Sequence, residues 1–225
     1  MSKIDCVTVC VDFDDYLALT LGRMVQTFDR VAVVTVQADT ATQRLAERHG
    51  AQVVLSDRQH HLQEAFNLPA LINDGVNALS PPEWICKIDT DIYLPRDARA
   101  QLDTALDDPE LLWGTRRYFC ETAQIFRNFE ETSNYNLLEP PYEDNDPDVL
   151  GFFQLAHVHS QHLDMARRGT FYAEDRYEGP SRTNDRILSG AYPEAQRRRT
   201  PFDVVHLGLD AIGTNWKGRK APRFF

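Results

Sequence analysis

The sequence predicts an α/β protein in which a mostly parallel sheet lies between layers of helices. Two nearly continuous apolar and β-branched runs, Ile4 to Val11 and Val31 to Val36, have the character of parallel strands buried on both faces. The segment between them, Asp14 to Phe28, carries apolar residues at helical spacing. Strand, helix and strand in this order form a βαβ unit, and because the alternation continues along the chain we expect a three-layer sandwich.

The same alternation continues to about residue 95. The charged segment Thr40 to His49 predicts a helix, and Ala51 to Leu55 predicts the third strand. Leu62 to Leu79 predicts a helical region that Pro69 breaks, and the strand Trp84 to Ile88 follows it. The first 95 residues therefore supply four strands to the central sheet.

Beyond Pro95 the pattern is weaker. Glu130 to Asp148 contains prolines among acidic and Asn residues, which predicts a long loop that is either an active-site lid or a disordered segment. The remaining expected elements are helices at Asp97 to Leu106 and Asp185 to Ala191, and strands at Trp113 to Thr115, Gly151 to His159 and Val204 to Leu207.

Composition restricts the classes of protein that fit. The chain has 225 residues and a net charge of -10. No apolar run approaches the ~20 residues that a membrane span needs, and the first residues carry no apolar targeting run, so we expect a cytoplasmic protein without a membrane span. The four cysteines form no CxxC pair and are expected to be reduced core residues.

Charge is distributed unevenly along the chain. Residues 151–225 hold 12 Lys and Arg against 8 Asp and Glu, although the whole chain is acidic. We therefore expect any anionic ligand to be held partly by this last third. The densest basic cluster, Arg197 to Arg199, is expected to be a solvated loop, and the alternative is contact with an anionic acceptor.

Two carboxylates follow the fourth strand. Asp89 and Asp91 lie two residues apart where a buried apolar run ends, and α/β sheets bind ligands at the carboxyl ends of their strands. Such carboxylates can hold a divalent cation that also binds phosphate oxygens, which is how Mg²⁺ and Mn²⁺ are commonly used. The alternative is a solvated turn after a strand.

These residues resemble a known family. The strand that runs into Asp89-Thr90-Asp91-Ile92 and Leu94-Pro95 resembles the metal-binding DxD strand of the GT-A nucleotide-sugar glycosyltransferases, especially their family 2-like members. Phe66 to Gly75 is similar to the Asn-containing helix of that family, and Val7 to Leu17 resembles its first strand and nucleotide-contacting turn. The resemblance covers residues 4–95 well and the remainder patchily.

The resemblance implies a GT-A, Rossmann-like fold and a single domain over residues 1–225. Residues 1–95 would be the nucleotide-sugar-binding half, and residues 96–225 the acceptor-binding half that also completes the metal and diphosphate site. The metal ligands that it implies, for Mn²⁺ or Mg²⁺, are Asp89, Asp91 and His206. The donor-binding residues that it implies are Val11, Asp12, Asp39, Asn67, Asn73, Asp89, Thr90, Lys217 and Arg219.

The family commonly places an Asp where the acceptor hydroxyl must lose its proton. Asp185 occupies the corresponding region of this chain, about ninety residues after the DxD. Glu174 and Asp175 are alternatives for this base, and spacing does not choose among the three. A carboxylate there can accept the proton as the hydroxyl attacks the anomeric carbon with inversion.

The function that the resemblance implies is transfer of a sugar from a nucleoside diphosphate sugar, with UDP favoured, to an acceptor hydroxyl. A saccharide acceptor is favoured over a nucleic acid, such as a hydroxylated DNA base, because the chain is acidic and phosphate contacts dominate nucleic-acid affinity. A sugar-phosphate nucleotidyltransferase is one alternative, but it predicts a glycine-rich basic loop where Val11 to Leu17 is acidic and glycine-free. A non-catalytic nucleotide-sugar-binding module is the other.

Overall fold

The computed structural model describes residues 2–58, 67–79, 82–141, 151–163, 170–172, 188–208 and 224. A seven-stranded sheet forms its centre, in the order β3-β2-β1-β4-β8-β6-β9. β8 runs antiparallel to both of its neighbours and every other adjacent pair is parallel, which confirms the mostly parallel sheet. Its strands are β1 (Ile4–Val9), β2 (Arg30–Thr35), β3 (Gln52–Leu55), β4 (Trp84–Ile88), β6 (Leu112–Gly114), β8 (Phe153–His157) and β9 (Arg197–Arg199).

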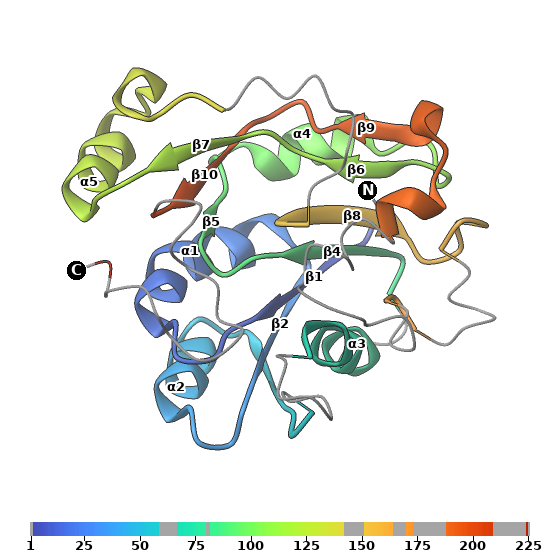
Figure 1. Ribbon diagram of the computed structural model, residues 1–225, viewed down its shortest axis with the longest axis horizontal. Coiled ribbons are helices and arrows are strands. Elements are labelled where there is room, and N and C mark those ends of the chain that lie inside the picture. Colours follow the sequence, from blue (N-terminus) through green and yellow to red (C-terminus); the bar gives the residue numbers. More distant parts are fainter. Residues whose placement is uncertain are drawn as a thin grey trace.

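A second, three-stranded sheet lies beside the first and has the order β5-β10-β7 (Figure 1). It consists of β5 (Ile92–Tyr93), β7 (Arg117–Cys120) and β10 (Val204–Leu207). β10 pairs antiparallel with β5 and parallel with β7, so the last described strand joins two segments from the middle of the chain.

Helices cover both faces of the central sheet, as the sequence predicts (Figure 1). Side chains such as Cys6 and Val33 point into the core that α1 and α2 share, whereas Val7 and Val34 point into the core beneath α3. This alternation is what a strand buried on both faces requires. The helices are α1 (Asp14–Thr27), α2 (Thr40–Arg48), α3 (Leu68–Ala78), α4 (Ala98–Ala105) and α5 (Ala123–Thr132), with 3-10 helices at Tyr135–Leu137 and Glu194–Gln196.

Several elements differ from the sequence-based expectations. Pro69 lies in the first turn of α3, where its missing N–H costs no helical hydrogen bond, and residues 62–66 of the helical region expected before it lie outside the described residues. Arg197 to Arg199 form the edge strand β9, not a loop, and Arg198 and Arg199 remain exposed. The sequence also did not predict β5 or α5. Residues 188–191 are helical and belong to the short helix expected from Asp185.

The cysteine expectation is confirmed, since Cys6, Cys10, Cys86 and Cys120 are all unbridged and buried. Burial raises the pKa of the Cys10 thiol to about 12. Among the residues described, no helix combines the length and the apolar character that crossing a membrane demands.

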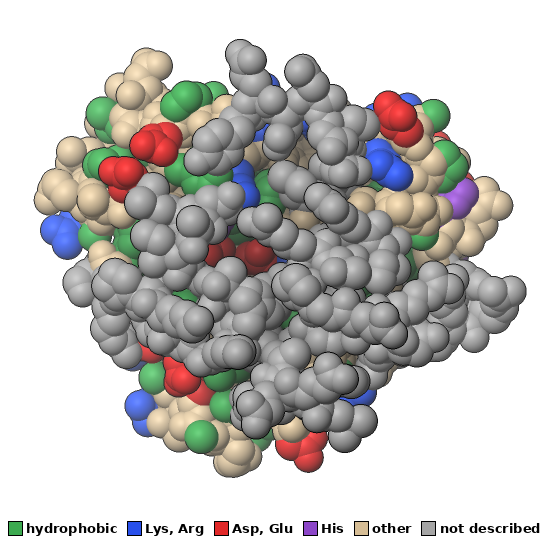
Figure 2. Space-filling view, in the orientation of Figure 1, with side chains coloured by type: hydrophobic (Ala, Val, Ile, Leu, Met, Phe, Trp, Pro, Cys, Tyr) green, Lys and Arg blue, Asp and Glu red, His purple; other side chains and the backbone are tan. Residues whose placement is uncertain are grey.

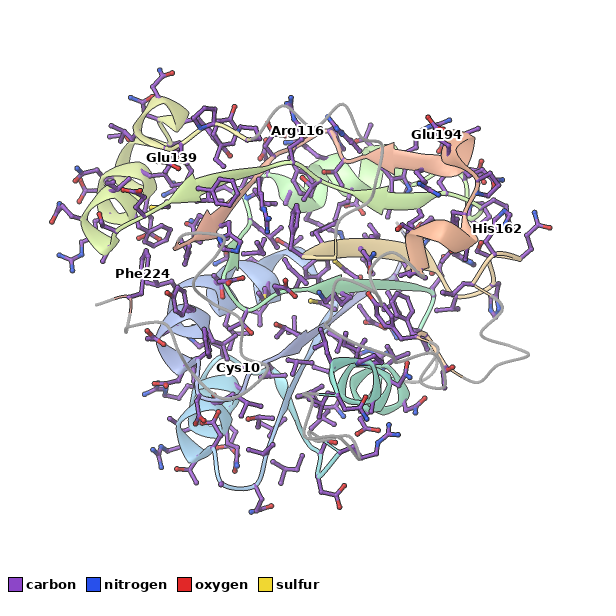
Figure 3. All side chains as sticks on the ribbon, viewed as in Figure 1. Cys10, Arg116, Glu139, His162, Glu194 and Phe224 are labelled. Atoms are coloured by element: carbon purple, nitrogen blue, oxygen red, sulfur yellow. The ribbon has the colours of Figure 1, made fainter. Side chains whose placement is uncertain are left out.

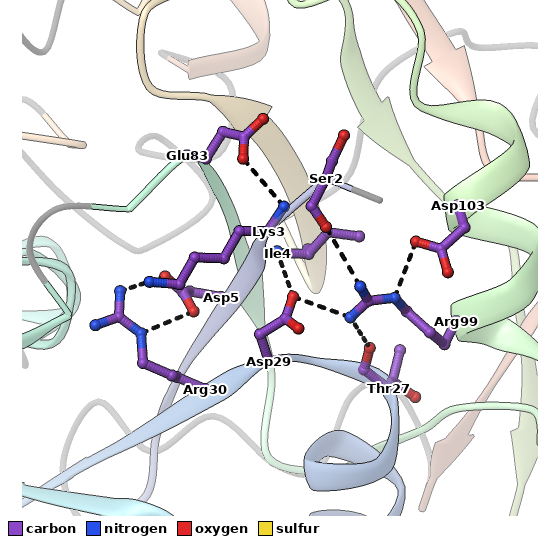
Figure 4. Close-up of polar contacts among 10 residues, drawn as sticks. All are labelled: Ser2, Lys3, Ile4, Asp5, Thr27, Asp29, Arg30, Glu83, Arg99 and Asp103. Carbon is purple, nitrogen blue, oxygen red and sulfur yellow. Dashed lines mark hydrogen bonds and ion pairs between the residues drawn. The ribbon is translucent and has the colours of Figure 1, made fainter.

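An ion-pair network ties the first strand to α4 (Figure 4). Asp29 accepts hydrogen bonds from the backbone N–H of Ile4 at 2.8 Å and from Nη1 of Arg99 at 3.0 Å. Arg99 also donates to Asp103 at 3.0 Å, one turn further along α4. Burial raises the pKa of Asp29, but these hydrogen bonds outweigh it and leave the pKa below its usual value. The carboxylate is therefore held in its charged form at the amino end of β1.

The start of α1 carries a contact from the far end of the sequence. The backbone N–H of Phe224 donates to Oδ2 of Asp15 at 2.8 Å, and its ring centroid lies 5.2 Å from that of Tyr16. The ring centroid of Phe126, on α5, lies 6.5 Å from that of Phe224. Figure 3 labels Phe224. Residue 224 is thus fixed between α1 and α5.

The close approach of α3 to the sheet depends on Gly75. A Cβ at this position would lie 2.5 Å from Cγ1 of Val7 and 2.7 Å from Cγ2 of Val34. We expect Gly75→Ala to lower the free energy of unfolding by about 1–3 kcal/mol, because overpacking moves the helix off the strands. Urea denaturation followed by circular dichroism measures this change.

Gly22→Ala is the matched control within a helix. Its Cβ would meet nothing nearer than His49 at 3.8 Å, so the substitution is expected to be neutral or to stabilise by up to about 1 kcal/mol. Equal stability of the two variants would contradict the packing described for α3.

Candidate functional site

The candidate site lies where the order of the strands reverses. β1 has β2 on one side and β4 on the other, and ligands of such sheets bind in the crevice beyond the carboxyl ends of these strands. Val11 and Asp12 follow β1, and Asp89 to Asp91 follow β4. In Figure 2, Asp and Glu side chains are set back near the middle of the molecule, in the region where β4 passes into β5 in Figure 1.

The turn after β1 is held by Asp39. Asp12 adopts a left-handed backbone conformation with φ of 60°, and its N–H donates to Oδ2 of Asp39 at 2.9 Å. Asp39 also caps α2, where it accepts from the N–H of Thr42 at 3.1 Å and from its hydroxyl at 2.7 Å. The carboxylate is buried, so in this structure it orients the turn, while the Asp12 side chain remains exposed.

The turn after β4 is fixed by Thr90. Its hydroxyl donates to the carbonyl of Val9 at 2.7 Å, and its own carbonyl accepts from the hydroxyl of Thr20 at 2.7 Å. The N–H of Asp89 donates to the carbonyl of Phe152 at 2.9 Å. The Asp89–Asp91 turn is therefore bound to β1, to α1 and to the segment before β8, which leaves its carboxylates little freedom.

Lys87 is a site residue that the sequence analysis missed. It lies in β4, where all five residues are buried, and its Nζ is 2.5 Å from Oδ1 of Asp89. The same ammonium donates to the carbonyl of Gly151. The Lys87 side chain is 3% exposed and that of Asp89 is 40% exposed. A lysine within an otherwise apolar strand was the signal available in the sequence.

Asp91 and His206 lie side by side although 115 positions separate them. Nε2 of His206 is 3.5 Å from Oδ2 of Asp91, because β10 pairs with β5 in the register that places His206 opposite Ile92. The N–H of Leu207 donates to the Asp91 carbonyl at 2.9 Å and reinforces this register. Nδ1 of His206 lies 3.4 Å from the carbonyl of Gly208, which directs Nε2 toward the carboxylate.

The Asp91 carboxylate is incompletely satisfied. Its Oδ1 is shielded from solvent and has no hydrogen-bond partner in the part of the chain that the structure describes. Burial raises the pKa of Asp91, and the charge of His206 only partly opposes this effect. A buried carboxylate oxygen without a donor is costly unless a cation or a hydrogen bond compensates it.

This donor set fits a divalent cation. Carboxylate oxygen and imidazole nitrogen together suit Mn²⁺, and the side chain of Asp91 is 23% exposed, so solvent reaches the pair. No group of three or more Asp, Glu, His or Cys residues converges on one point within the described ranges. Asp91 and His206 thus form a pair there, while Asp89, the third expected ligand, is engaged with Lys87.

Arg117 adds positive charge near this pair and was also not predicted. Its guanidinium carbon lies 4.5 Å from the ring centroid of Phe152 and 5.0 Å from that of Phe119. The charge of Arg117 lowers the pKa of Asp91, although burial is the larger effect and keeps this pKa raised.

The two asparagines expected to bind the donor make contacts within the protein. Asn67 caps α3 through a 3.4 Å hydrogen bond from the N–H of Ala70. Asn73 is 1% exposed, and its Oδ1 accepts from the N–H groups of Phe171 and Tyr172 at 3.0 and 2.9 Å. Their contact with a donor stays a prediction, as does that of Val11.

Other predicted residues lie outside the described part of the chain. They are the expected base Asp185, its alternatives Glu174 and Asp175, and the expected diphosphate ligands Lys217 and Arg219. Of the loop expected at Glu130 to Asp148, the structure describes residues through 141, and its first residues belong to α5.

Solved structures share this fold. A mannosyltransferase from Pyrobaculum calidifontis, solved with GDP-Man and Mn²⁺, superposes with a TM-score of 0.55 at 17% identity, over 94% of this chain and 57% of that one. The 4-diphosphocytidyl-2C-methyl-D-erythritol synthase from Anaerococcus prevotii superposes with a TM-score of 0.50 at 11% identity, over 93% of this chain and 90% of that one. No family model matches the chain, and no curated protein does.

These likenesses establish the fold. The chain has the Rossmann-like, GT-A type of α/β fold that the DxD resemblance implies, and it spans little more than half the length of the mannosyltransferase.

Replacing Lys87 tests its part in the site. In Lys87→Met the Gly151 carbonyl loses a buried donor and Asp89 loses its partner, whereas the aliphatic stem is kept. We expect the free energy of unfolding to fall by about 1–3 kcal/mol, since an unsatisfied buried acceptor carries this cost. Chemical denaturation measures the fall.

The exposed Lys3 provides the control, because Lys3→Met removes the same charge from the surface. If both variants changed stability by less than about 0.5 kcal/mol, as surface substitutions do, the Lys87 bridge would not stabilise the fold.

Proposed function

We propose that this protein is a metal-dependent glycosyltransferase that uses a nucleoside diphosphate sugar as donor. The observation that carries the proposal is the Asp91–His206 pair at the carboxyl end of β4, beside the strand-order reversal. Oδ1 of this aspartate has no hydrogen-bond partner among the described residues. The GT-A type fold supports it, and the mannosyltransferase that shares the fold was solved with GDP-Man and Mn²⁺. UDP is the nucleotide that the family resemblance favours.

Each described residue has a defined part in this proposal. A divalent cation bound by Asp91 and His206 would neutralise charge on the departing diphosphate. Thr90 holds the turn against Val9, so that the carboxylates are oriented before any ligand arrives. Lys87 holds Asp89 at 2.5 Å and fixes the direction of its second oxygen. Arg117 adds positive charge on the same side as Asp91.

The acceptor side completes the reaction. We propose that Asp185 takes the proton of the acceptor hydroxyl as its oxygen attacks the anomeric carbon, while the bond from that carbon to the diphosphate oxygen breaks. The nucleoside diphosphate leaves, and the anomeric configuration inverts. Lys217 and Arg219 are the proposed cationic ligands of the leaving diphosphate, and a saccharide is the proposed acceptor, with a nucleic-acid acceptor less favoured.

A nucleotidyltransferase is the second candidate. It is supported by the likeness to the Anaerococcus prevotii synthase, which extends over 90% of that chain. Such an enzyme would join a nucleoside triphosphate to a sugar phosphate and release pyrophosphate. The acidic turn around Asp12 argues against it, because a triphosphate requires basic or glycine-rich surroundings there.

The two candidates release different products. Purified protein is incubated with UDP-, GDP- or dTDP-sugars in Mn²⁺, Mg²⁺ or chelator, and free nucleoside diphosphate is measured. Parallel reactions contain nucleoside triphosphates and sugar phosphates, and the released pyrophosphate is measured. We expect metal-dependent release of a nucleoside diphosphate and no pyrophosphate; the reverse pattern would support the second candidate.

Variants of the pair test the site itself. Asp91→Asn and His206→Ala are each expected to reduce donor turnover by at least about 10–100-fold, and to remove the rise in melting temperature that Mn²⁺ alone gives the wild-type protein. Asp107→Asn and His159→Ala, both at exposed positions, are the matched controls. Full turnover in Asp91→Asn with Mn²⁺ present would reject this site.

A further inference from the structure

A separate pocket lies on the other face of the three-stranded sheet. It has a volume of about 480 Å³ and is formed by β5, β7, α4, α5 and the residues next to β10. We call it the tyrosine pocket, after Tyr93, Tyr118 and Tyr135, which line it. Its volume is within the range of about 300–1,000 Å³ that small-molecule sites occupy.

Strand alternation separates this pocket from the candidate active site. Val205 is paired with Tyr93 on one side and Tyr118 on the other, so these three side chains share one face of the sheet. His206 is paired with Ile92 and Phe119 and therefore points to the opposite face. The two sites are back to back on β10.

Aromatic rings make the walls of the tyrosine pocket. The rings of Tyr118 and Tyr135 meet edge to face at 4.9 Å, and those of Phe129 and Tyr135 do so at 5.1 Å. Tyr93 and Phe129 are buried, whereas Tyr118 and Tyr135 are only partly so and present ring surface to the pocket. Edge-to-face packing fixes these rings in place, so a ligand meets a preformed apolar wall.

The charges around this wall balance. Asp203 is neutralised by Arg116, labelled in Figure 3, through two hydrogen bonds of 3.0 Å. The hydroxyl of Tyr93 accepts a hydrogen bond from Arg23 at 2.9 Å and donates one to Glu130 at 3.2 Å. The basic Arg23 and the acidic Glu130 therefore lie near the same hydroxyl.

The remaining charged residues of the lining, Arg96 and Asp97, are adjacent in sequence, exposed and opposite in sign. The pocket thus offers hydrogen-bond donors and acceptors without an excess of either charge.

The phenol of Tyr135 keeps its proton. Burial raises the pKa of Tyr135, and the nearby carboxylates of Asp203 and Asp97 raise it further. A tyrosine whose pKa is raised keeps its proton at neutral pH. A phenol next to carboxylates provides the mixed donors and acceptors that hydroxyl groups recognise.

We propose that the tyrosine pocket is a second binding site, for an uncharged saccharide. Apolar ring surface suits the C–H face of a sugar, and the surrounding carboxylates and phenols suit its hydroxyls. The balanced charge disfavours phosphorylated or cationic ligands. Binding in the tyrosine pocket requires no sugar transfer at Asp91, so the two proposals can be tested independently of each other.

Saturation-transfer NMR on the full chain tests the proposal with maltose, cellobiose and N,N′-diacetylchitobiose as neutral probes and spermidine as the cationic probe. We expect at least one disaccharide to receive saturation and spermidine to receive none. Tyr118→Ala should weaken the affinity about fivefold or more, whereas Tyr118→Phe, which keeps the ring, should change it less than about threefold. Glu130→Ala, at an exposed helical position, should weaken it about threefold without disturbing the fold.

Three results would overturn the proposal. The first is that no disaccharide binds the wild-type protein. The second is that spermidine binds in their place and is lost in Glu130→Ala. The third is that disaccharide binding is removed by Asp91→Asn but unaffected by Tyr118→Ala and Glu130→Ala, which would place the sugar in the candidate active site. Disaccharide binding in a preparation without transferase activity would leave the tyrosine pocket intact and reject only the glycosyltransferase proposal.

Discussion

The buried ammonium of Lys87 is the constraint on which the geometry of the site depends. An ammonium group cannot be taken out of water without partners that replace its hydration, and β4 provides none within its apolar run. At the end of the strand the ammonium donates to Asp89 and to the carbonyl of Gly151. Because Gly151 leads into β8, this one requirement joins the first half of the chain to the second at the Asp89–Asp91 turn.

Around this junction, Thr20, Asp39 and Thr90 each bind the backbone of a neighbouring segment. Thr90 binds Val9, Thr20 binds Thr90, and Asp39 binds the N–H groups of Asp12 and Thr42. Oδ1 of Asp91 is the contrast, since it is shielded from solvent and has no partner in the described residues. Fixed neighbouring groups around such an oxygen prepare a position for an incoming cation, because the protein groups are oriented during folding and need not move when the cation binds.

The sequence predicted the features that local residue patterns determine, which are buried strands and the turn that follows one of them. Buried β-branched runs identified β1, β2 and β4, and the DxD after β4 identified the Asp89–Asp91 turn. It did not predict β5, which has two residues, or β9, whose three arginines have no apolar side to mark a strand. The approach of His206 to Asp91 came from the family resemblance, since spacing along the chain carries no information on the pairing of β10 with β5. Lys87 was visible in the sequence, but its partner Gly151 depends on β8 lying beside β4.

The arginines of β9 have a consequence for the protein in a crowded solution. β9 is the last strand of the central sheet, and no further strand from the described residues covers the outer row of its backbone groups. An open edge invites the strand of another molecule, and growth of sheets from edge to edge is a common start of aggregation. Arg198 and Arg199 on this strand are exposed, and a second copy pairing there would bring the same positive charges close to them. Electrostatic repulsion between identical edges thus favours separate molecules over stacked ones.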